Sequence, residues 1–179
     1  MPAIIVLAAG ASKRLGRPKQ LLLWEGETLL DRAVRIATAV GETIVVLPPD
    51  LGLRRLAAAF VINEKPEEGV ASSIRAGVSA ASGDVLIMTC DQPRITSEHL
   101  QSLINSNAPI AATGYNGISG VPAFFAAKFR DELLALRGDV GAKRVIESHR
   151  DEVVTIPFAA AALDVDTAAD YNFAPFQRS

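Results

Sequence analysis

The sequence predicts an α/β fold in which a mostly parallel, mixed central sheet is covered by helices on both faces, as a three-layer sandwich. Continuous apolar runs at 3–7, 43–47 and 84–89 are typical of strands that are buried on both faces. Segments with apolar residues at helical spacing alternate with these runs, as in parallel α/β sheets. The dipeptide Asn116-Gly117 then indicates a hairpin, which makes the sheet mixed.

The same patterns predict each element in order. We expect strands at 3–7, 43–47, 60–63, 84–89, 109–115, 120–125, 153–156 and 163–165. We expect helices at 28–40, 51–59, 69–81, 96–105, 128–136 and 142–149, and a last helix from 167. The apolar stripe of the first helix includes Leu30 and Val34, and Thr96 is a candidate N-cap of the fourth.

Length and composition indicate one soluble domain over residues 1–179, with a sizeable core. A net charge of −2 gives no general attraction to nucleic acid or to anionic membranes. No apolar run approaches the roughly 18 residues of a membrane helix, and Met1-Pro2 leads into a strand without a basic leader. We therefore expect a cytoplasmic protein.

The cysteine and histidines do not indicate a metal or redox centre. Cys90 is the single cysteine, so an internal disulfide is excluded, and we expect a core thiol. His99 and His149 fall in predicted helices, and we expect both on the surface. Their wide separation also disfavours a structural zinc site.

The loop after the first strand contains the most distinctive chemistry. Residues 8–19 include two glycines, one proline, four basic residues and no acid. Small residues let a backbone approach a ligand closely, and clustered Arg and Lys favour a phosphate chain. The spacing fits neither the P-loop nor the dinucleotide motif. A solvated basic loop is the alternative.

A carboxylate follows the fourth predicted strand. Asp91-Gln92-Pro93 comes about 80 residues after Gly10, yet the two segments lie at the carboxyl ends of parallel strands and can face one crevice. Mg²⁺ prefers one or two carboxylates together with phosphates and water. Asp91 is thus a candidate metal ligand, and a turn or helix-capping aspartate is the alternative.

Three further segments carry polar residues for which the sequence allows a purely structural role. Asp164 and Asp166 share one face of a predicted strand, but Asp166 also fits an N-cap. Ser72 and Ser73 lie on the polar side of a predicted helix. The segment 138–141 has the composition of an ordinary helix–helix loop.

These motifs together resemble a known family. The run Leu7-Ala8-Ala9-Gly10-x-Ser12-x-Arg14-x-Gly16-x-Pro18-Lys19 is similar to the signature of the MobA-like nucleotidyltransferases, and is most similar to the molybdenum cofactor cytidylyltransferases. The resemblance implies a Rossmann-like fold of the nucleotide-diphospho-sugar transferase type. It extends in order from Ile4 to Tyr171.

The resemblance also implies roles for individual residues. It places a nucleoside triphosphate on Leu7, Ala8, Ala9, Gly10, Ser12, Arg14, Lys19, Asn63, Ser72, Ser73 and Gly77. Within that set, Arg14 and Lys19 hold the phosphates and act in catalysis. It implies Asp91 and Asp166 as metal ligands, and an acceptor near Gly120, Pro122, Gly138, Asp139 and Gly141. Val121 stands where histidine is frequent in the family, and Ala168 where proline is usual.

The reaction implied is the Mg²⁺-dependent transfer of CMP from CTP to the phosphate of the molybdenum–molybdopterin cofactor, with release of pyrophosphate. CTP is preferred because Leu-Ala-Ala-Gly is similar to the cytidylyltransferase branch, whereas the guanylyl branch usually has Leu-Ala-Gly-Gly. Three alternatives remain: a GTP-using enzyme, an enzyme with another acceptor such as a sugar phosphate, and a non-catalytic nucleotide-binding accessory protein. The last would have a molybdenum hydroxylase as its partner.

Overall fold

The computed structural model describes residues 1–10, 18–51 and 58–165, and its centre is a seven-stranded sheet. The strand order is β5-β4-β1-β6-β8-β7-β9. Strand β8 runs antiparallel to β6 and β7, and the other pairings are parallel. The strands span β1 Ala3–Leu7, β4 Thr43–Leu47, β5 Ala59–Ile62, β6 Val85–Thr89, β7 Ile110–Tyr115, β8 Ile118–Phe125 and β9 Val153–Pro157.

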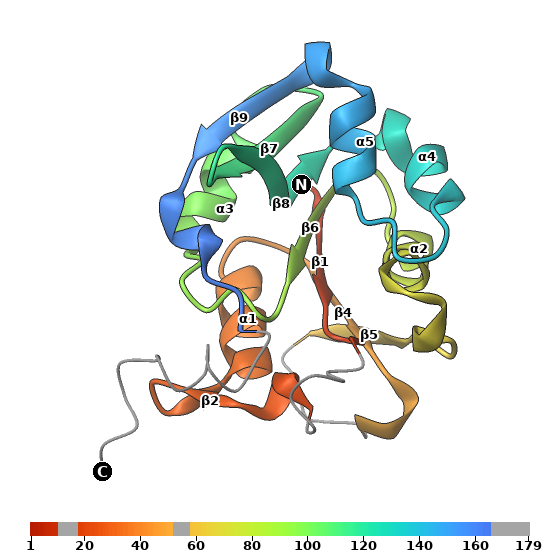
Figure 1. Cartoon of the computed structure of the whole chain (residues 1–179), viewed down its shortest axis with the longest axis vertical. Helices are drawn as coiled ribbons and strands as arrows, with labels where there is room; N and C mark the ends of the chain where they lie inside the picture. The colour runs from red at the N-terminus through yellow and green to blue at the C-terminus, as the bar shows by residue number, and fades with distance from the viewer. Residues whose placement is uncertain (11–17, 52–57, 166–179) are drawn as a thin grey trace.

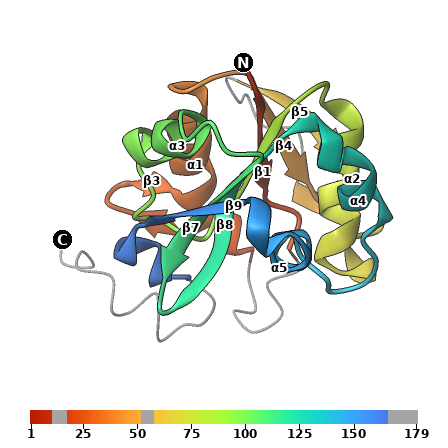
Figure 2. The same cartoon turned by 90° about the horizontal axis from the view of Figure 1, so that it is seen from above.

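Helices cover both faces of this sheet (Figures 1 and 2). Helices α2, α4 and α5 lie on one face, and α1 and α3 lie on the other. The helices span α1 Leu29–Thr38, α2 Val70–Ala80, α3 Ser97–Ile104, α4 Arg130–Ala135 and α5 Lys143–Ser148. The structure confirms the predicted α/β class with a mixed, mostly parallel sheet.

Strand β1 shows why continuous apolar runs form the centre of the sheet. Its neighbours are β4 and β6, and Ile5 pairs with Ile44 on one side and Ile87 on the other. Ile5 packs in the core beneath α2, whereas Ile4 and Val6 pack in the core beneath α1 and α3. Because side chains alternate between faces, a strand covered on both faces needs an apolar residue at every position.

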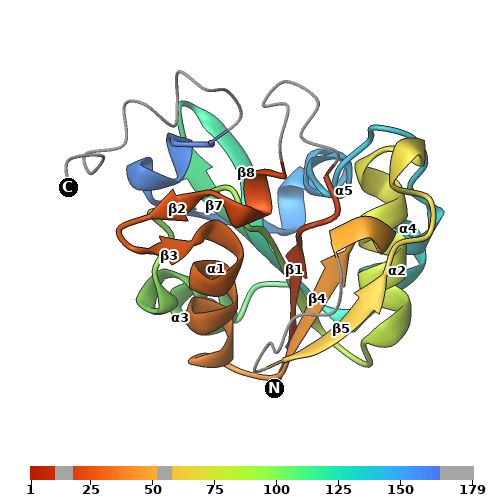
Figure 3. The same ribbon diagram turned by 90° about the horizontal axis from the view of Figure 1, so that it is seen from below.

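Two tight turns set the local geometry beside this sheet. Asn116 and Gly117 both have positive φ, 48° and 73°, as the turn of the β7–β8 hairpin requires. A second, two-stranded sheet of β2 (Leu23–Trp24) and β3 (Glu27–Thr28) turns at Glu25 and Gly26. Figure 3 shows this small sheet beside α1.

Several predicted elements differ from the structure. The expected strand at 163–165 is absent, and a short 3-10 turn at Ala159–Ala162 precedes that segment. Of the expected helix at 51–59, Leu51 ends a 3-10 turn that begins at Pro49, Ala59 begins strand β5, and 52–57 lie outside the described residues. The predicted helix from 167 also lies outside them.

The prediction of a surface His99 was wrong. His99 is 5% exposed, its Nε2 lies 2.8 Å from Thr113 Oγ1, and its ring stacks on Phe158 at 4.2 Å between centroids. Burial lowers the pKa of this imidazole. Helical periodicity did not reveal this contact, because Thr113 lies on β7 and Phe158 follows β9, both distant in sequence.

Gly77 lies on the sheet-facing side of α2 and has a packing role. A Cβ at this position would lie 2.4 Å from Ile5 Cγ2 and 3.0 Å from Val46 Cγ2. The missing side chain therefore lets α2 approach the sheet closely. The place of Gly77 in the nucleotide-binding set that the resemblance implied stays a prediction.

Cys90 is a core thiol, as expected, with 3% of its surface exposed. Burial is the main cause that raises the pKa of this thiol to about 12, and the neighbouring charge of Asp91 adds to it. Among the helices of the described residues, none is long and apolar enough to cross a membrane.

We expect Gly77→Ala to lower the free energy of unfolding by about 1–2 kcal/mol. The added methyl group overpacks the rigid Ile5–Val46 contact, and this cost exceeds the gain in helix propensity. Urea unfolding measures the change. The control is Ser79→Ala on the exposed side of the same helix, which should be neutral or slightly stabilising. A Gly77→Ala protein as stable as the unaltered chain would contradict the packing role.

We expect the thiol of Cys90 to be unreactive toward a thiol reagent in the native protein at about pH 8, because the side chain is inaccessible. In concentrated urea one thiol per chain should react. Stoichiometric labelling without denaturant would show that the end of β6 opens in solution, contrary to the core packing described here.

Candidate active site

The carboxyl ends of β1 and β6 bring two opposite charges together. Lys19 follows the loop after β1, and Asp91 follows β6, which pairs with β1 in parallel. Lys19 Nζ donates a hydrogen bond to Asp91 Oδ2, across 72 residues of sequence. The two side chains are only 16% and 14% exposed. A partly shielded ion pair thus lies where two strands end, as predicted for the crevice.

The backbone that enters the basic loop is held by a buried amide. Gln20 Nε2 donates to Ala8 O at 2.5 Å and to Gly10 O at 3.1 Å, and the side chain is 1% exposed. Ala8 N also donates to Val46 O at 2.9 Å. Leu7, Ala8 and Ala9 are buried.

Not all residues of the predicted phosphate site fall within the described structure. Ser12 and Arg14 lie in residues 11–17, and Asp166 lies beyond residue 165, so all three are outside the described residues. Gly10 is described, and a Cβ there would lie 3.9 Å from Lys19 Cε. The structure therefore places Gly10 next to Lys19, and the roles of Ser12 and Arg14 stay predictions.

Asn63 fixes the first turn of α2 from the end of β5. Its Nδ2 donates to Ser72 Oγ at 2.8 Å and to Ser73 Oγ at 3.0 Å, while its Oδ1 accepts from Lys65 N at 3.0 Å. Ser72 Oγ donates in turn to Gly69 O at 2.8 Å. The three predicted nucleotide-binding side chains thus form one buried network at the start of α2.

The loop predicted to lie near the acceptor packs against that same helix start. Gly138 O accepts a hydrogen bond from Ala71 N at 3.1 Å. Gly69 has φ of 93°, and a Cβ there would lie 2.4 Å from Asp139 Oδ1 and 2.5 Å from Gly138 O. Glycine at 69 is required by both conformation and space. The predicted nucleotide and acceptor segments are therefore in contact.

Gln92, the residue after Asp91, forms a hydrogen bond with the β7–β8 hairpin. The 5%-exposed Gln92 donates through Nε2 to Val121 O at 3.3 Å and to Ala161 O at 3.1 Å. These bonds fix the strand that carries Gly120 and Pro122. The Val121–Pro122 peptide is cis, and Pro122 O accepts from Thr113 Oγ1 at 2.6 Å.

Tyr115 lies at this junction, where two carboxylates affect the pKa of its hydroxyl. A Cβ at Gly120 would lie 2.8 Å from the Tyr115 hydroxyl. Burial raises the pKa of Tyr115, and the negative charges of Asp164 and Asp91 raise it further, against a hydrogen bond with Gln92. Asp164 is brought close because Val165 N donates to Asp91 O at 2.9 Å.

This donor set is suited to a divalent cation that arrives with phosphates. Across residues 1–10, 18–51 and 58–165, no three His, Cys, Asp or Glu side chains form a ready metal cage. Mg²⁺ usually needs only one or two protein carboxylates, because phosphates and water complete its shell. Asp91 meets that requirement: its carboxylate already pairs with the Lys19 ammonium group, and the segment of Asp164 is bonded to its backbone.

Sequence reasoning missed Gln20, Gln92 and Tyr115 as parts of the site. Gln92 belonged to a recognised motif but had no role of its own. A signal existed for Gln20, because a polar residue directly follows Lys19 and directly precedes an apolar run. Its bonds to Ala8 and Gly10 depend on the three-dimensional path of the loop.

Comparisons with known proteins place this chain among nucleotidyltransferases. A family model described as the MobA-like NTP transferase domain matches residues 4–153. The purine catabolism protein PucB of Bacillus subtilis is 25% identical over 191 residues, which are 94% of this chain and 93% of the relative. Nicotine blue oxidoreductase of Paenarthrobacter nicotinovorans is 30% identical over 159 residues, 78% of each chain.

Two further similarities concern a cofactor enzyme and a metal complex. A probable molybdenum cofactor guanylyltransferase of Bacillus cereus is 31% identical over 111 residues, 58% of this chain and 56% of the relative. The crystal structure of Rv0371c from Mycobacterium tuberculosis in complex with manganese has a TM-score of 0.76 at 27% identity, covering 95% of each chain. Since the family model spans most of the sequence, the chain belongs to the family of MobA-like NTP transferase domains.

Proposed function

We propose that this chain is a Mg²⁺-dependent nucleotidyltransferase that transfers CMP from CTP to the phosphate of the molybdenum–molybdopterin cofactor and releases pyrophosphate. The observation that carries the proposal is the Lys19–Asp91 pair at the ends of β1 and β6. It provides one cation for phosphates and one carboxylate for a metal ion in the same crevice. Membership of the NTP transferase family supports the reaction type.

The reaction needs no general base, because the acceptor phosphate already carries its nucleophile. An oxygen of that phosphate forms a bond to the α-phosphorus of the nucleotide. The bond from the α-phosphorus to the oxygen that bridges to the β-phosphate breaks, and pyrophosphate leaves with the electron pair. Catalysis then consists of holding the reactants in line and neutralising charge.

The chain's own residues supply these functions. Lys19 neutralises charge that develops at the α-phosphate, and Arg14 holds the departing pyrophosphate. Asn63, Ser72 and Ser73 fix the nucleotide side, while Gly120, Pro122, Gly138, Asp139 and Gly141 border the acceptor. Asp91 and Asp166 would hold Mg²⁺, which neutralises the phosphate oxygens when bound. The manganese complex of the related Rv0371c is consistent with a divalent-cation site.

GTP is the second candidate donor. The relative from Bacillus cereus is named as a guanylyltransferase, whereas the preference for CTP rests on Ala9. A single methyl group discriminates only modestly between ligands. A molybdenum hydroxylase that receives the finished cofactor is the partner that we propose for this activity.

Pyrophosphate release with Mg²⁺ and a molybdopterin-type cofactor tests the proposal, with CTP, GTP, ATP and UTP supplied separately. We expect release with CTP. Release with GTP alone would keep the mechanism and overturn the interpretation of Ala9. Tight Mg²⁺-dependent nucleotide binding without release in any mixture would favour an accessory protein or a different acceptor.

Lys19→Ala should fold normally and lower the rate of pyrophosphate release by about 10²–10³-fold, the usual effect of removing one charge-stabilising donor. The matched control is Lys128→Ala, which removes an exposed lysine paired with Glu152 away from the crevice. That control should keep the rate of the unaltered protein. An unchanged rate in Lys19→Ala, with unfolding curves that match, would rule out the role given to Lys19.

A further inference from the structure

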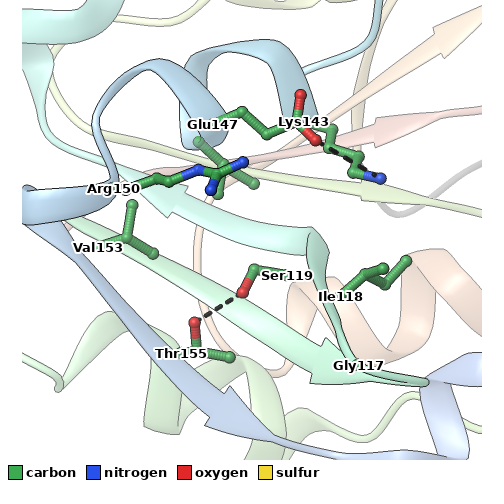
Figure 4. A pocket seen from close by; sticks show the side chains of 9 residues that line it. Gly117, Ile118, Ser119, Lys143, Glu147, Arg150, Val153 and Thr155 are labelled. Atoms are coloured by element: carbon green, nitrogen blue, oxygen red, sulfur yellow. Dashed lines mark hydrogen bonds and ion pairs between the residues drawn. The ribbon is translucent and has the colours of Figure 1, made fainter.

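A pocket of about 380 Å³ lies between α5 and the outer strands of the sheet. Figure 4 shows Lys143, Glu147 and Arg150 on one side, and Ser119 and Thr155 on the strands beneath them. This volume falls within the range of small-molecule sites. None of the motifs that the sequence analysis assigned to the nucleotide or the metal lines this pocket.

The floor of the pocket depends on a glycine in the middle strand. Ser119 on β8 and Thr155 on β9 are separated by β7, yet their hydroxyl oxygens lie 2.7 Å apart. They meet across Gly114, where a Cβ would lie 2.7 Å from Thr155 Cγ2. The missing side chain therefore allows the two hydroxyls to bridge the strand and leaves space above it.

The polar groups of the pocket are mainly hydrogen-bond donors. Two hydroxyls that share one hydrogen bond use one of their two protons, so the other proton is free for a ligand. Lys143 Nζ lies 3.7 Å from Glu147 Oε1, a long contact. Arg150 has no ion-pair partner among the described residues and projects toward the strands (Figure 4). A planar, always charged guanidinium and a free hydroxyl that line the same pocket favour an oxyanion.

Two elements of the pocket adjoin, along the chain, the segments predicted to border the acceptor. Helix α5 begins just after Gly141, where a Cβ would lie 3.8 Å from Val70 Cγ1 at the start of α2. On the strand side, Ser119 is followed directly by Gly120, and Gln92 holds the next residue, Val121. Helix α5 and strand β8 thus each connect a pocket residue to a segment proposed to border the acceptor.

We propose that this pocket binds a carboxylate or phosphate group at the end of the acceptor remote from the attacking phosphate. The identification of the ligand as the acceptor rests on the proposed function. The affinity of the pocket for an oxyanion rests only on the residues that line it. Arg150 is the principal contact, and the Ser119–Thr155 pair contributes the second donor. The pocket then selects acceptors that carry a second anionic group.

The first experiment tests the oxyanion site by titrating inorganic phosphate, and separately acetate, at constant ionic strength while following backbone amide resonances. We expect saturable shifts at Ser119 and Thr155, with binding weakened about tenfold or more in Arg150→Ala. Arg144→Ala is the matched control, because Arg144 lies on the same helix outside the pocket lining. Equal binding in the two variants, or no shifts at these amides, would overturn the site. Phosphate-only or acetate-only shifts would identify which group it takes.

The second experiment tests the occupant through pyrophosphate release. Arg150→Ala should raise the KM for the acceptor about tenfold and leave the KM for the nucleotide unchanged, while Arg144→Ala changes neither. An acceptor KM that is the same in both variants would overturn the assignment to the acceptor. If the unaltered protein releases no pyrophosphate but its pocket amides still respond to anions, the proposed function fails and the oxyanion site stands.

Discussion

Lys19 and Asp91 meet because β1 and β6 are neighbouring parallel strands whose carboxyl ends lie at one edge of the sheet. The rest of the candidate site depends on this adjacency, since the predicted phosphate loop and the candidate metal carboxylate come from distant parts of the sequence. Each charge of this partly buried pair is stabilised by the other. In the proposed function, the phosphates would replace Asp91 beside Lys19 and the cation would replace Lys19 beside Asp91, so neither charge would be left unpaired.

Two glutamine side chains hold the backbone around this pair, and a glycine allows two of its segments to pack closely. Gln20 holds the loop entrance through Ala8 and Gly10, and Gln92 holds the hairpin strand through Val121. Glycine at 69 allows the loop of Gly138 to touch the start of α2. These contacts hold together the segments that we predict to bind the nucleotide and the acceptor, and a transfer reaction depends on such positioning.

The fold was largely predictable because its signals are local. Continuous apolar runs identified β1, β4 and β6, the Thr96 side chain accepts from His99 N as an N-cap should, and Asn116-Gly117 forms the expected hairpin turn. The segment 163–165 was mistaken for a strand because its alternation is typical of one. In the structure its backbone instead donates to Asp91 O.

Less of the candidate site was predictable. The residue types and order located Lys19, Asp91 and the Asn63–Ser72–Ser73 group, and the structure brings Lys19 to Asp91 and the other three into one network. The roles of Gln20 and Tyr115 depend on contacts between segments far apart in sequence, which no local pattern encodes. The same holds for the pocket floor at Gly114, where space between three strands requires glycine.

The most direct test of the central claim is to follow labelled phosphorus from CTP, placed at the α-position in one sample and at the γ-position in another. With Mg²⁺ and a molybdopterin-type cofactor, the account predicts that the α-label becomes attached to the acceptor and the γ-label appears in pyrophosphate. Transfer of the γ-label to the acceptor, or its release as inorganic phosphate, would mean that a different bond breaks and would contradict the account.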